Sequence, residues 1–545
     1  MQINKSLYTK ITLEKLLIFL IFVFFIIKLI TRIWTLNKGL VFNDEGWYLL
    51  LLRDQPTDIT STNFYKYFNY FNVSNLYYIR IATFILDLIA ITIFTSGIYL
   101  FNQHNNNIKR KDFLIIFLLC FIGYDLAAIP VAGVFSYITL NRTIALTSIG
   151  LILLSKSYNE IISNTFLTIS GFITGALVFI MITNSPFIIL LMIFIFFIYG
   201  SFPKVRFIKV GYFIGGVLLA IIYYFVFIEP LNTFYNNIIY NANLVLNNKI
   251  KGGYDMYSLF RWIKQLIIYY LFDVVIYSFS LIGVVSLMKN SKLLKKITLI
   301  GLIIVVVLIY YYKFVYKFSN NLGGISSINP ILITTTGIFI YNFYLQKKIS
   351  VLHLQYLIIS LITPILLSFG SNIFFETRVT VYLTFLLPVS YLLLNNIEDR
   401  KHITNIFLMV ILLYSINLYP MMKKSNWSGI VYTQQKTNTK TIGISQNVLL
   451  DEKRITGLKS IMKYTKAGET VSVSSLNLFG YVYLLDLKLC DYNFNPQLIT
   501  SKPKSTDTFI EDINIPFSST FITENSLSEC TIIRLNNEFT IYKRK

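Results

Sequence analysis

The chain has 545 residues, of which 55% are hydrophobic and only 14% are charged, and this balance excludes an ordinary soluble protein. Its formal net charge of +22 at pH 7 does not indicate a nucleic-acid partner, because the basic residues fall in short clusters between apolar runs. Uncharged runs of about 18 residues or more are typical of transmembrane helices. The sequence therefore predicts an α-helical integral membrane protein with many spans.

The first apolar run, 16–36, follows Lys5, Lys10 and Lys15, as the apolar core of a signal peptide would. The run is too long for a signal peptide and lacks a small-residue cleavage site. We therefore expect an uncleaved anchor with its N-terminus in the cytoplasm. The loop 37–75 then lies on the extracytoplasmic side.

The later apolar runs fit one alternating topology, because each basic turn between them falls on the cytoplasmic side. The predicted spans after the first are 76–101, 113–130, 137–154, 161–183, 186–200, 208–228, 265–288, 297–316, 325–345, 351–369, 379–395 and 403–420. With 16–36 they make about thirteen spans, an odd number that places the rest of the chain outside. Between the seventh and eighth spans, apolar residues recur at helical spacing over 231–246, which predicts a short interfacial helix.

After residue 420, Lys, Thr, Ser and Asn become more frequent and the apolar runs shorten to the length of strands. Helical spacing over 451–466 ends before Gly468. Strands are predicted at 470–474, 509–513, 520–523, 531–535 and 539–542. We therefore expect two domains, a transmembrane domain 1–420 that includes the loop 37–75, and a small extracytoplasmic α/β domain 421–545. Cys490 and Cys530 both fall in the second domain, and a disulfide between them stays open.

Two adjacent carboxylates, Asp44 and Glu45, lie in the loop just beyond the first predicted span. Acidic residues are scarce in this chain, and ionisable groups held at membrane depth tend to be functional. In a cavity, Asp44 would lose hydration and become a stronger base. Capping of a short helix by Asn43 or Asp44 is the alternative role, and it does not exclude the first.

Several cations on the outer side oppose the positive-inside trend. Arg378 begins a predicted span there, Arg142 opens another and Lys317 closes a third. A guanidinium suits the geometry of phosphate, whereas contact with lipid headgroups is the alternative for all three residues. Asp125, in the third predicted span, is either a second acid of the site or an acid paired within the bundle.

Three further charged residues are placed outside the site. Arg53 and Arg80 flank the first loop, where lipid headgroups could be their partners. Asp87, in the second predicted span, is similar in kind to Asp125 and is left out of the site.

The predicted layout consists of one anchor helix, an outer loop with Asp44-Glu45-Gly46-Trp47-Tyr48, about a dozen further spans and a small outer C-terminal domain. This layout resembles the GT-C class of membrane glycosyltransferases. The chain is similar to the bacterial relatives of protein mannosyltransferases and aminoarabinose lipid A transferases. The segment 468–488 is similar to their outer domain. The resemblance implies that the acid of the first loop, Asp44, is the essential carboxylate and that Glu45 supports it.

The resemblance also implies the substrates and the compartment. A polyprenyl-phosphate sugar is the expected donor and a lipid, glycan or protein the acceptor, at the extracytoplasmic face of a bacterial inner membrane. Arg378 and Arg142 are then expected to hold the phosphate. Members often carry a second acid in the turn between the third and fourth helices, but the corresponding turn, 132–141, has none. The second acid and a divalent cation therefore stay open.

Two other classes of function remain as alternatives. A polysaccharide polymerase or ligase is expected to place its key arginines in a large mid-chain loop, and not an acid after the first helix. A transporter needs paired charges at mid-membrane or helices broken by Gly and Pro in matching halves. The sequence has no such symmetry.

Overall fold

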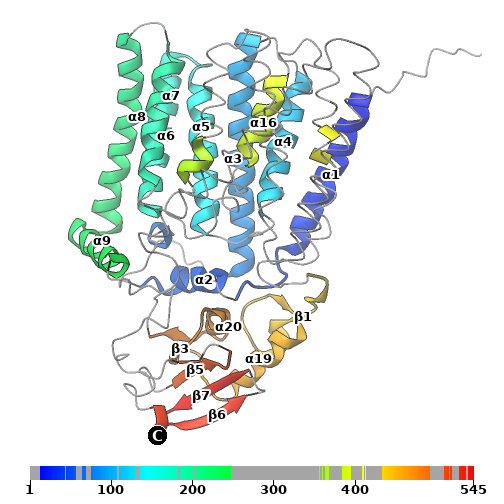
Figure 1. Ribbon diagram of the computed structural model, residues 1–545, viewed down its shortest axis with the longest axis vertical. Coiled ribbons are helices and arrows are strands. Elements are labelled where there is room, and N and C mark those ends of the chain that lie inside the picture. The colour runs from blue at the N-terminus through cyan, green and yellow to red at the C-terminus, as the bar shows by residue number, and fades with distance from the viewer. Residues whose placement is uncertain are drawn as a thin grey trace, which may run out of the picture.

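The computed structural model describes residues 13–42, 44–56, 64–68, 75–106, 110–128, 136–181, 184–200, 203–246, 432–490, 508–514, 516–517, 527–535 and 538–544, and parts of 355–412. These residues form a helical bundle and a C-terminal domain built on a small sheet. Figure 1 shows the bundle above, the sheet domain below and the short helix α2 (Asp44–Asp54) between them.

The described part of the bundle consists of α1 (Leu13–Thr35), α3 (Leu76–Asn106), α4 (Arg110–Ala128), α5 (Tyr137–Ser155), α6 (Glu160–Ile180), α7 (Ser185–Ile198), α8 (Pro203–Tyr223) and α16 (Leu383–Leu394). Helix α8 continues into the π-helical turn η3 (Tyr224–Ile228). Within the described residues, five helices are long and apolar enough to cross a membrane, and these are Leu13–Thr35, Leu76–Gln103, Tyr137–Ser155, Glu160–Ile180 and Pro203–Ile228.

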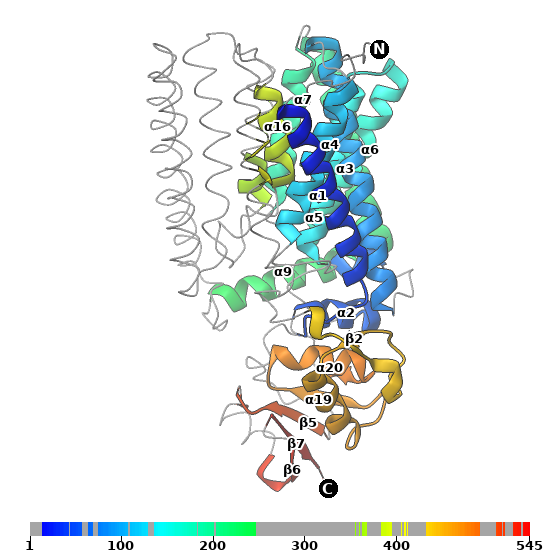
Figure 2. The same cartoon turned by 90° about the vertical axis from the view of Figure 1, so that its right-hand side faces the viewer.

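Two shorter helical segments lie near the same end of the bundle as α2. The 3₁₀ helix η1 (Phe64–Phe68) belongs to the first loop. Helix α9 (Leu231–Leu246) runs across the end of the bundle instead of along it, as Figure 2 shows. Pro230 precedes α9, and the chain changes direction there between η3 and α9.

The C-terminal domain has a five-stranded sheet in the order β4-β3-β5-β7-β6. Its strands are β3 (Thr470–Val473), β4 (Lys488–Leu489), β5 (Thr508–Asp512), β6 (Thr531–Leu535) and β7 (Phe539–Lys543). Strand β3 pairs in parallel with β4 and β5, whereas β7 pairs antiparallel with β5 and β6. The helices α19 (Glu452–Met462) and α20 (Phe479–Leu484) and a two-stranded ladder, β1 (Thr437–Asn438) with β2 (Leu449–Leu450), complete the domain.

The first loop shares its hydrophobic core with the C-terminal domain. Trp47 and the leucines at 49–52 of α2 are buried in one cluster with residues of β3, α20 and β7. An isolated parallel bridge also joins Lys38 to Leu449. Residues 37–42 and 44–54 therefore pack as part of the C-terminal domain, although helices of the bundle flank them on both sides in the sequence.

The predicted elements and the observed ones agree closely where both can be compared. The run 76–101 is the core of α3, the helix predicted at 231–246 has the bounds of α9, and the strand 509–513 overlaps β5. The helices predicted at 265–288, 297–316 and 325–345 and the strand at 520–523 lie outside the described residues.

Candidate functional site

Glu45 and Arg80 form a buried ion pair at the junction of the bundle and the C-terminal domain. Arg80 donates from Nε to Oε1 of Glu45 at 2.8 Å and from Nη2 to Oε2 at 2.7 Å. Glu45 is 1% exposed and Arg80 5%. Two parallel bonds of this kind are the strongest arrangement that a guanidinium and a carboxylate can form. Arg80, for which the sequence suggested lipid headgroups, is instead buried against Glu45.

The same two side chains hold the backbone of the first loop. Arg80 also donates to three loop carbonyls, those of Leu36 at 3.0 Å, Lys38 at 3.3 Å and Gly39 at 2.9 Å. The backbone N–H of Val41 donates to Oε2 of Glu45 at 3.0 Å. Because every one of these groups is paired, the ion pair fixes the path of the chain from the end of α1 to the start of α2.

A close contact between two glycines fixes the start of α2 against α20. A Cβ on Gly46 would lie 2.5 Å from the backbone nitrogen of Gly480, so a side chain at this position does not fit. The N–H of Gly480 donates to the carbonyl of Phe42 at 2.7 Å. The guanidinium of Arg454 stacks over the ring of Phe42, 4.4 Å from its centre.

The other end of α2 is held by Arg53. Its guanidinium pairs with Asp54 and with Asp486, the latter at 3.2 Å, and donates to the carbonyl of Leu487. Helix α2 is therefore attached to the C-terminal domain at both ends.

Asp44 is the first residue of α2, directly before Glu45. Its side chain lies outside the described residues, so its contacts stay a prediction. Its backbone stands between two residues, Val41 and Glu45, that the ion pair holds in place. Glu45, in contrast, accepts hydrogen bonds on both oxygens.

Arg142 lies in a second buried cluster, near the same end of the bundle. Its Nη2 contacts Oδ2 of Asp87 at 3.4 Å, and its guanidinium lies 4.0 Å from the ring centre of Tyr124. Tyr124 donates to Asp87 at 2.6 Å, Thr143 donates to the other oxygen, and Arg32 reaches the Tyr124 hydroxyl at 3.4 Å. Sequence reasoning left Asp87 out, but its place two helical turns after Arg80, on the same face of α3, could have indicated it.

Arg142 and the neighbouring Asn141 have polar side-chain atoms without partners among the described residues. The Nε of Arg142 has none, and the same holds for both amide atoms of Asn141, which is fully buried. A buried polar group without a partner is uncommon in a folded protein and requires an explanation. One such explanation is a ligand that brings hydrogen-bond acceptors to this end of α5.

A third cluster joins the first loop to α9. Lys66 of η1 pairs with Glu229 at 2.6 Å. Glu229 also accepts from Tyr224 at 2.7 Å and from Asn237 at 2.8 Å, and it is 3% exposed. A buried carboxylate with three such donors holds η1, η3 and α9 together.

Tyr432 of the C-terminal domain lies near enough to Arg80 and Arg32 for their charges to affect its pKa. Burial raises the pKa of Tyr432 above that of an exposed phenol, whereas nearby Arg80 and Arg32 lower it by smaller amounts. The phenol therefore stays protonated at neutral pH and keeps its capacity to donate a hydrogen bond.

Models of known protein families and curated proteins were compared with this chain, and neither comparison finds a match. Arg378 and Lys317 lie outside the described residues, and Asp125 lies in α4 with its side chain outside them. In the described part of the chain, no three His, Cys, Asp or Glu residues group as a metal site.

Proposed function

We propose that this chain is a membrane glycosyltransferase that moves one sugar from a polyprenyl-phosphate donor to a lipid, glycan or protein acceptor. The bundle lies in the bilayer of a bacterial inner membrane and the C-terminal domain lies on the extracytoplasmic side. Five helices of sufficient length and apolarity support the place of the bundle. The resemblance to the GT-C class supports the reaction and the donor.

The observation that carries the proposal is that both carboxylate oxygens of Glu45 are already engaged. Glu45 is engaged on both oxygens by Arg80 and the loop backbone, so it acts as a support. Asp44 follows from this as the acid that orients or deprotonates the acceptor hydroxyl. The acid next to a rigid ion pair is held in position before substrate binds, and such positioning lowers the barrier to a bimolecular step.

The reaction breaks the bond between the anomeric carbon and the phosphate oxygen while the acceptor oxygen forms a bond to that carbon. The acceptor proton passes to Asp44, and polyprenyl phosphate leaves with one additional negative charge. Cations near the leaving group stabilise this charge. Arg142, whose Nε has no partner among the described residues, is proposed for this task, together with Arg378.

The second buried cluster supports a polar ligand at this place more than a purely structural role. Asp87 neutralises one guanidinium, yet Arg142 contacts it through Nη2 only, at 3.4 Å. The amide of Asn141 adds a donor and an acceptor on the neighbouring residue. A phosphate or a sugar hydroxyl would satisfy these groups, and the gain would offset the cost of leaving them unpaired in the free protein.

The test is a transfer assay with purified protein in proteoliposomes. Radiolabelled polyprenyl-phosphate sugars are supplied one at a time with a total lipid and glycan extract as acceptor, and nucleotide sugars serve as the matched donor control. Transfer from a polyprenyl-phosphate sugar, without transfer from the nucleotide sugars, is the expected result. Absence of transfer from every lipid-linked donor, combined with movement of label across the vesicle wall, would favour a transporter and contradict the proposal.

A further inference from the structure

The surface of helix α9 consists of three strips along the helix axis. One is exposed and apolar, one is exposed and polar, and one faces the protein. The residues exposed on one edge are apolar, with Leu231 59%, Tyr235 61% and Ile239 40% exposed. Each is four residues after the previous one, so they form a stripe along one side of the helix. Such a stripe facing water would be unfavourable.

The second strip of α9 is exposed and polar. It consists of Asn232, Thr233 and Asn236. At about 100° of rotation per residue, this strip lies directly beside the apolar edge. The third strip faces the protein, where Asn237 is buried and Phe234 and Ile238 are half-buried. The described half of the helix therefore has protein on one side, and its free surface separates into an apolar and a polar part.

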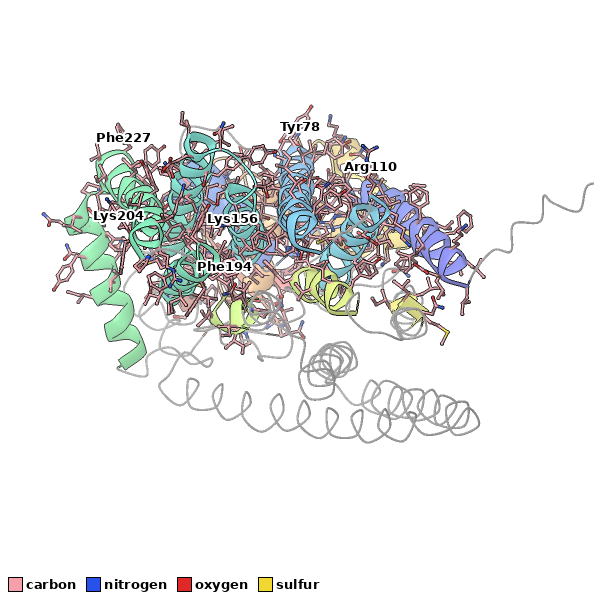
Figure 3. The ribbon with its side chains drawn as sticks, turned by 90° about the horizontal axis from the view of Figure 1, so that it is seen from above. Tyr78, Arg110, Lys156, Phe194, Lys204 and Phe227 are labelled. Atoms are coloured by element: carbon pink, nitrogen blue, oxygen red, sulfur yellow. The ribbon has the colours of Figure 1, made fainter. Side chains whose placement is uncertain are left out.

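The segment that precedes α9, α8 with η3, also carries exposed apolar side chains. There the exposed large side chains include Leu218, Leu219, Ile222, Val226 and Phe227. Figure 3, which looks down the bundle, shows Phe227 at the rim. In the proposed arrangement, these side chains face lipid, because they belong to the span Pro203–Ile228. Leu231, the first residue of α9, comes four residues after Phe227, with Glu229 and Pro230 between them.

The rotation of α9 about its own axis is fixed. Asn237 donates to Glu229 at 2.8 Å, and Glu229 is held by Lys66 at 2.6 Å. Phe234 packs edge-on against Tyr224, with ring centres 5.7 Å apart. The helix cannot roll to turn its apolar edge inward without breaking these contacts.

We propose that α9 lies flat in the outer leaflet of the lipid bilayer. Leu231, Tyr235 and Ile239 lie among the acyl chains, and Asn232 and Asn236 face the water. The sequence of α9 carries no charged residue, so the partner is the apolar boundary of the bilayer and not an anionic headgroup. This inference depends on the proposed place of the bundle in a membrane but not on the proposed reaction.

The experiment measures where each edge of α9 lies. Single cysteines are introduced by Tyr235→Cys or Ile239→Cys on the apolar edge and by Asn232→Cys or Asn236→Cys on the polar edge, each with Cys490→Ser to remove the half-buried native thiol. An environment-sensitive fluorophore is attached in phosphatidylcholine proteoliposomes. Quenching by nitroxide-labelled lipid is expected to be severalfold stronger at 235 and 239 than at 232 and 236. Quenching by aqueous iodide is expected in the reverse order.

A cysteine on α8 separates this inference from the membrane assignment itself. Leu219 is 52% exposed on the bundle surface. A fluorophore attached to Leu219→Cys is expected to be quenched by lipid nitroxide only. If position 219 is quenched by lipid but 235 responds mainly to iodide, α9 does not lie in the leaflet. If neither quencher reaches 235, protein covers the apolar edge and the proposal is wrong. If 219 itself is not quenched by lipid, the bundle is not in the bilayer and both proposals fail together.

Discussion

Glu45 and Arg80 lie 35 residues apart in the chain and meet through two charge-assisted hydrogen bonds of 2.8 and 2.7 Å. Removal of one partner from a buried pair costs about 3–5 kcal/mol, because the other charge stays buried without compensation. We therefore expect Arg80→Met to lower the unfolding temperature strongly. Glu45→Gln should lower it as well, because the Arg80 charge then stays buried without compensation and the amide offers only one acceptor oxygen in place of two.

The matched control for this pair is Arg110→Met, because Arg110 is exposed at the start of α4. Surface substitutions of this kind change stability by about 0.5 kcal/mol or less. The measurement is the unfolding temperature in detergent, which is monitored by size-exclusion chromatography of heated samples. Equal temperatures for Arg80→Met and Arg110→Met would show that the pair does not hold the loop.

Gly480→Ala is expected to loosen the contact between the first loop and the C-terminal domain. A Cβ on Gly480 would lie 2.6 Å from the ring of Phe42, so the two segments must separate. Overpacking of this kind costs about 1–3 kcal/mol. Gly215→Ala is the control, because nothing lies within 4 Å of the Cβ that it adds. Faster proteolytic release of the C-terminal domain in the first variant, and not in the second, is the expected outcome.

Lys66 and Glu229 are expected to be coupled. Each single variant, Lys66→Met or Glu229→Gln, leaves the other side chain buried without its partner. The double variant removes both charges and should be more stable than the sum of the two single effects implies. Coupling energies of directly contacting residues are about 0.5–3 kcal/mol. A double-mutant cycle of unfolding free energies measures this, and strict additivity would exclude a role for the pair in holding α9.

Glu469 gives the C-terminal domain an acid-sensitive contribution to stability. Burial raises the pKa of Glu469, but hydrogen bonds from Thr508 and the Lys466 backbone, with the charge of Lys543, outweigh it and leave the pKa below the ordinary value of 4.5. A depressed carboxylate pKa stabilises the fold above the unfolded pKa, and this stability is lost as the pH falls through the folded pKa. Hydrogen exchange in 470–473 and 508–512, corrected for intrinsic rates, should therefore increase on acidification below 4.5. The increase should be smaller in Glu469→Gln.

Local periodicity was sufficient to predict the long helices of the bundle, α9, α19 and the strands β3, β5, β6 and β7, but not α20, β1, β2 or β4. The pattern at 231–246 gave the bounds of α9, because an amphipathic repeat is contained within the element itself. The pairing of distant segments leaves no such pattern. Arg53 and Tyr483, for example, meet across 430 residues of chain, and nothing near either residue indicates that α2 packs into the C-terminal domain.

In the candidate site, too, the local sequence pattern was predictable and the pairing of distant residues was not. The doublet Asp44-Glu45 was visible in the sequence, but the different situations of the two acids depend on Arg80, which lies on another helix. Asp87 was passed over because an acid within an apolar run does not identify its own partner. Arg142 and Tyr124 come from other helices, and only their packing makes the cluster evident. The contributions of Arg378, Lys317 and Asp125 stay predictions.

The central claim is that Asp44 performs the chemistry while Glu45 maintains the structure. The most direct measurement is the initial rate of sugar transfer by Asp44→Asn in proteoliposomes, alongside its unfolding temperature. Loss of a general base lowers rates by about 10²–10⁴-fold, so we expect a drop of this size with an unfolding temperature equal to that of the wild type. Transfer by Asp44→Asn at the wild-type rate would contradict the account.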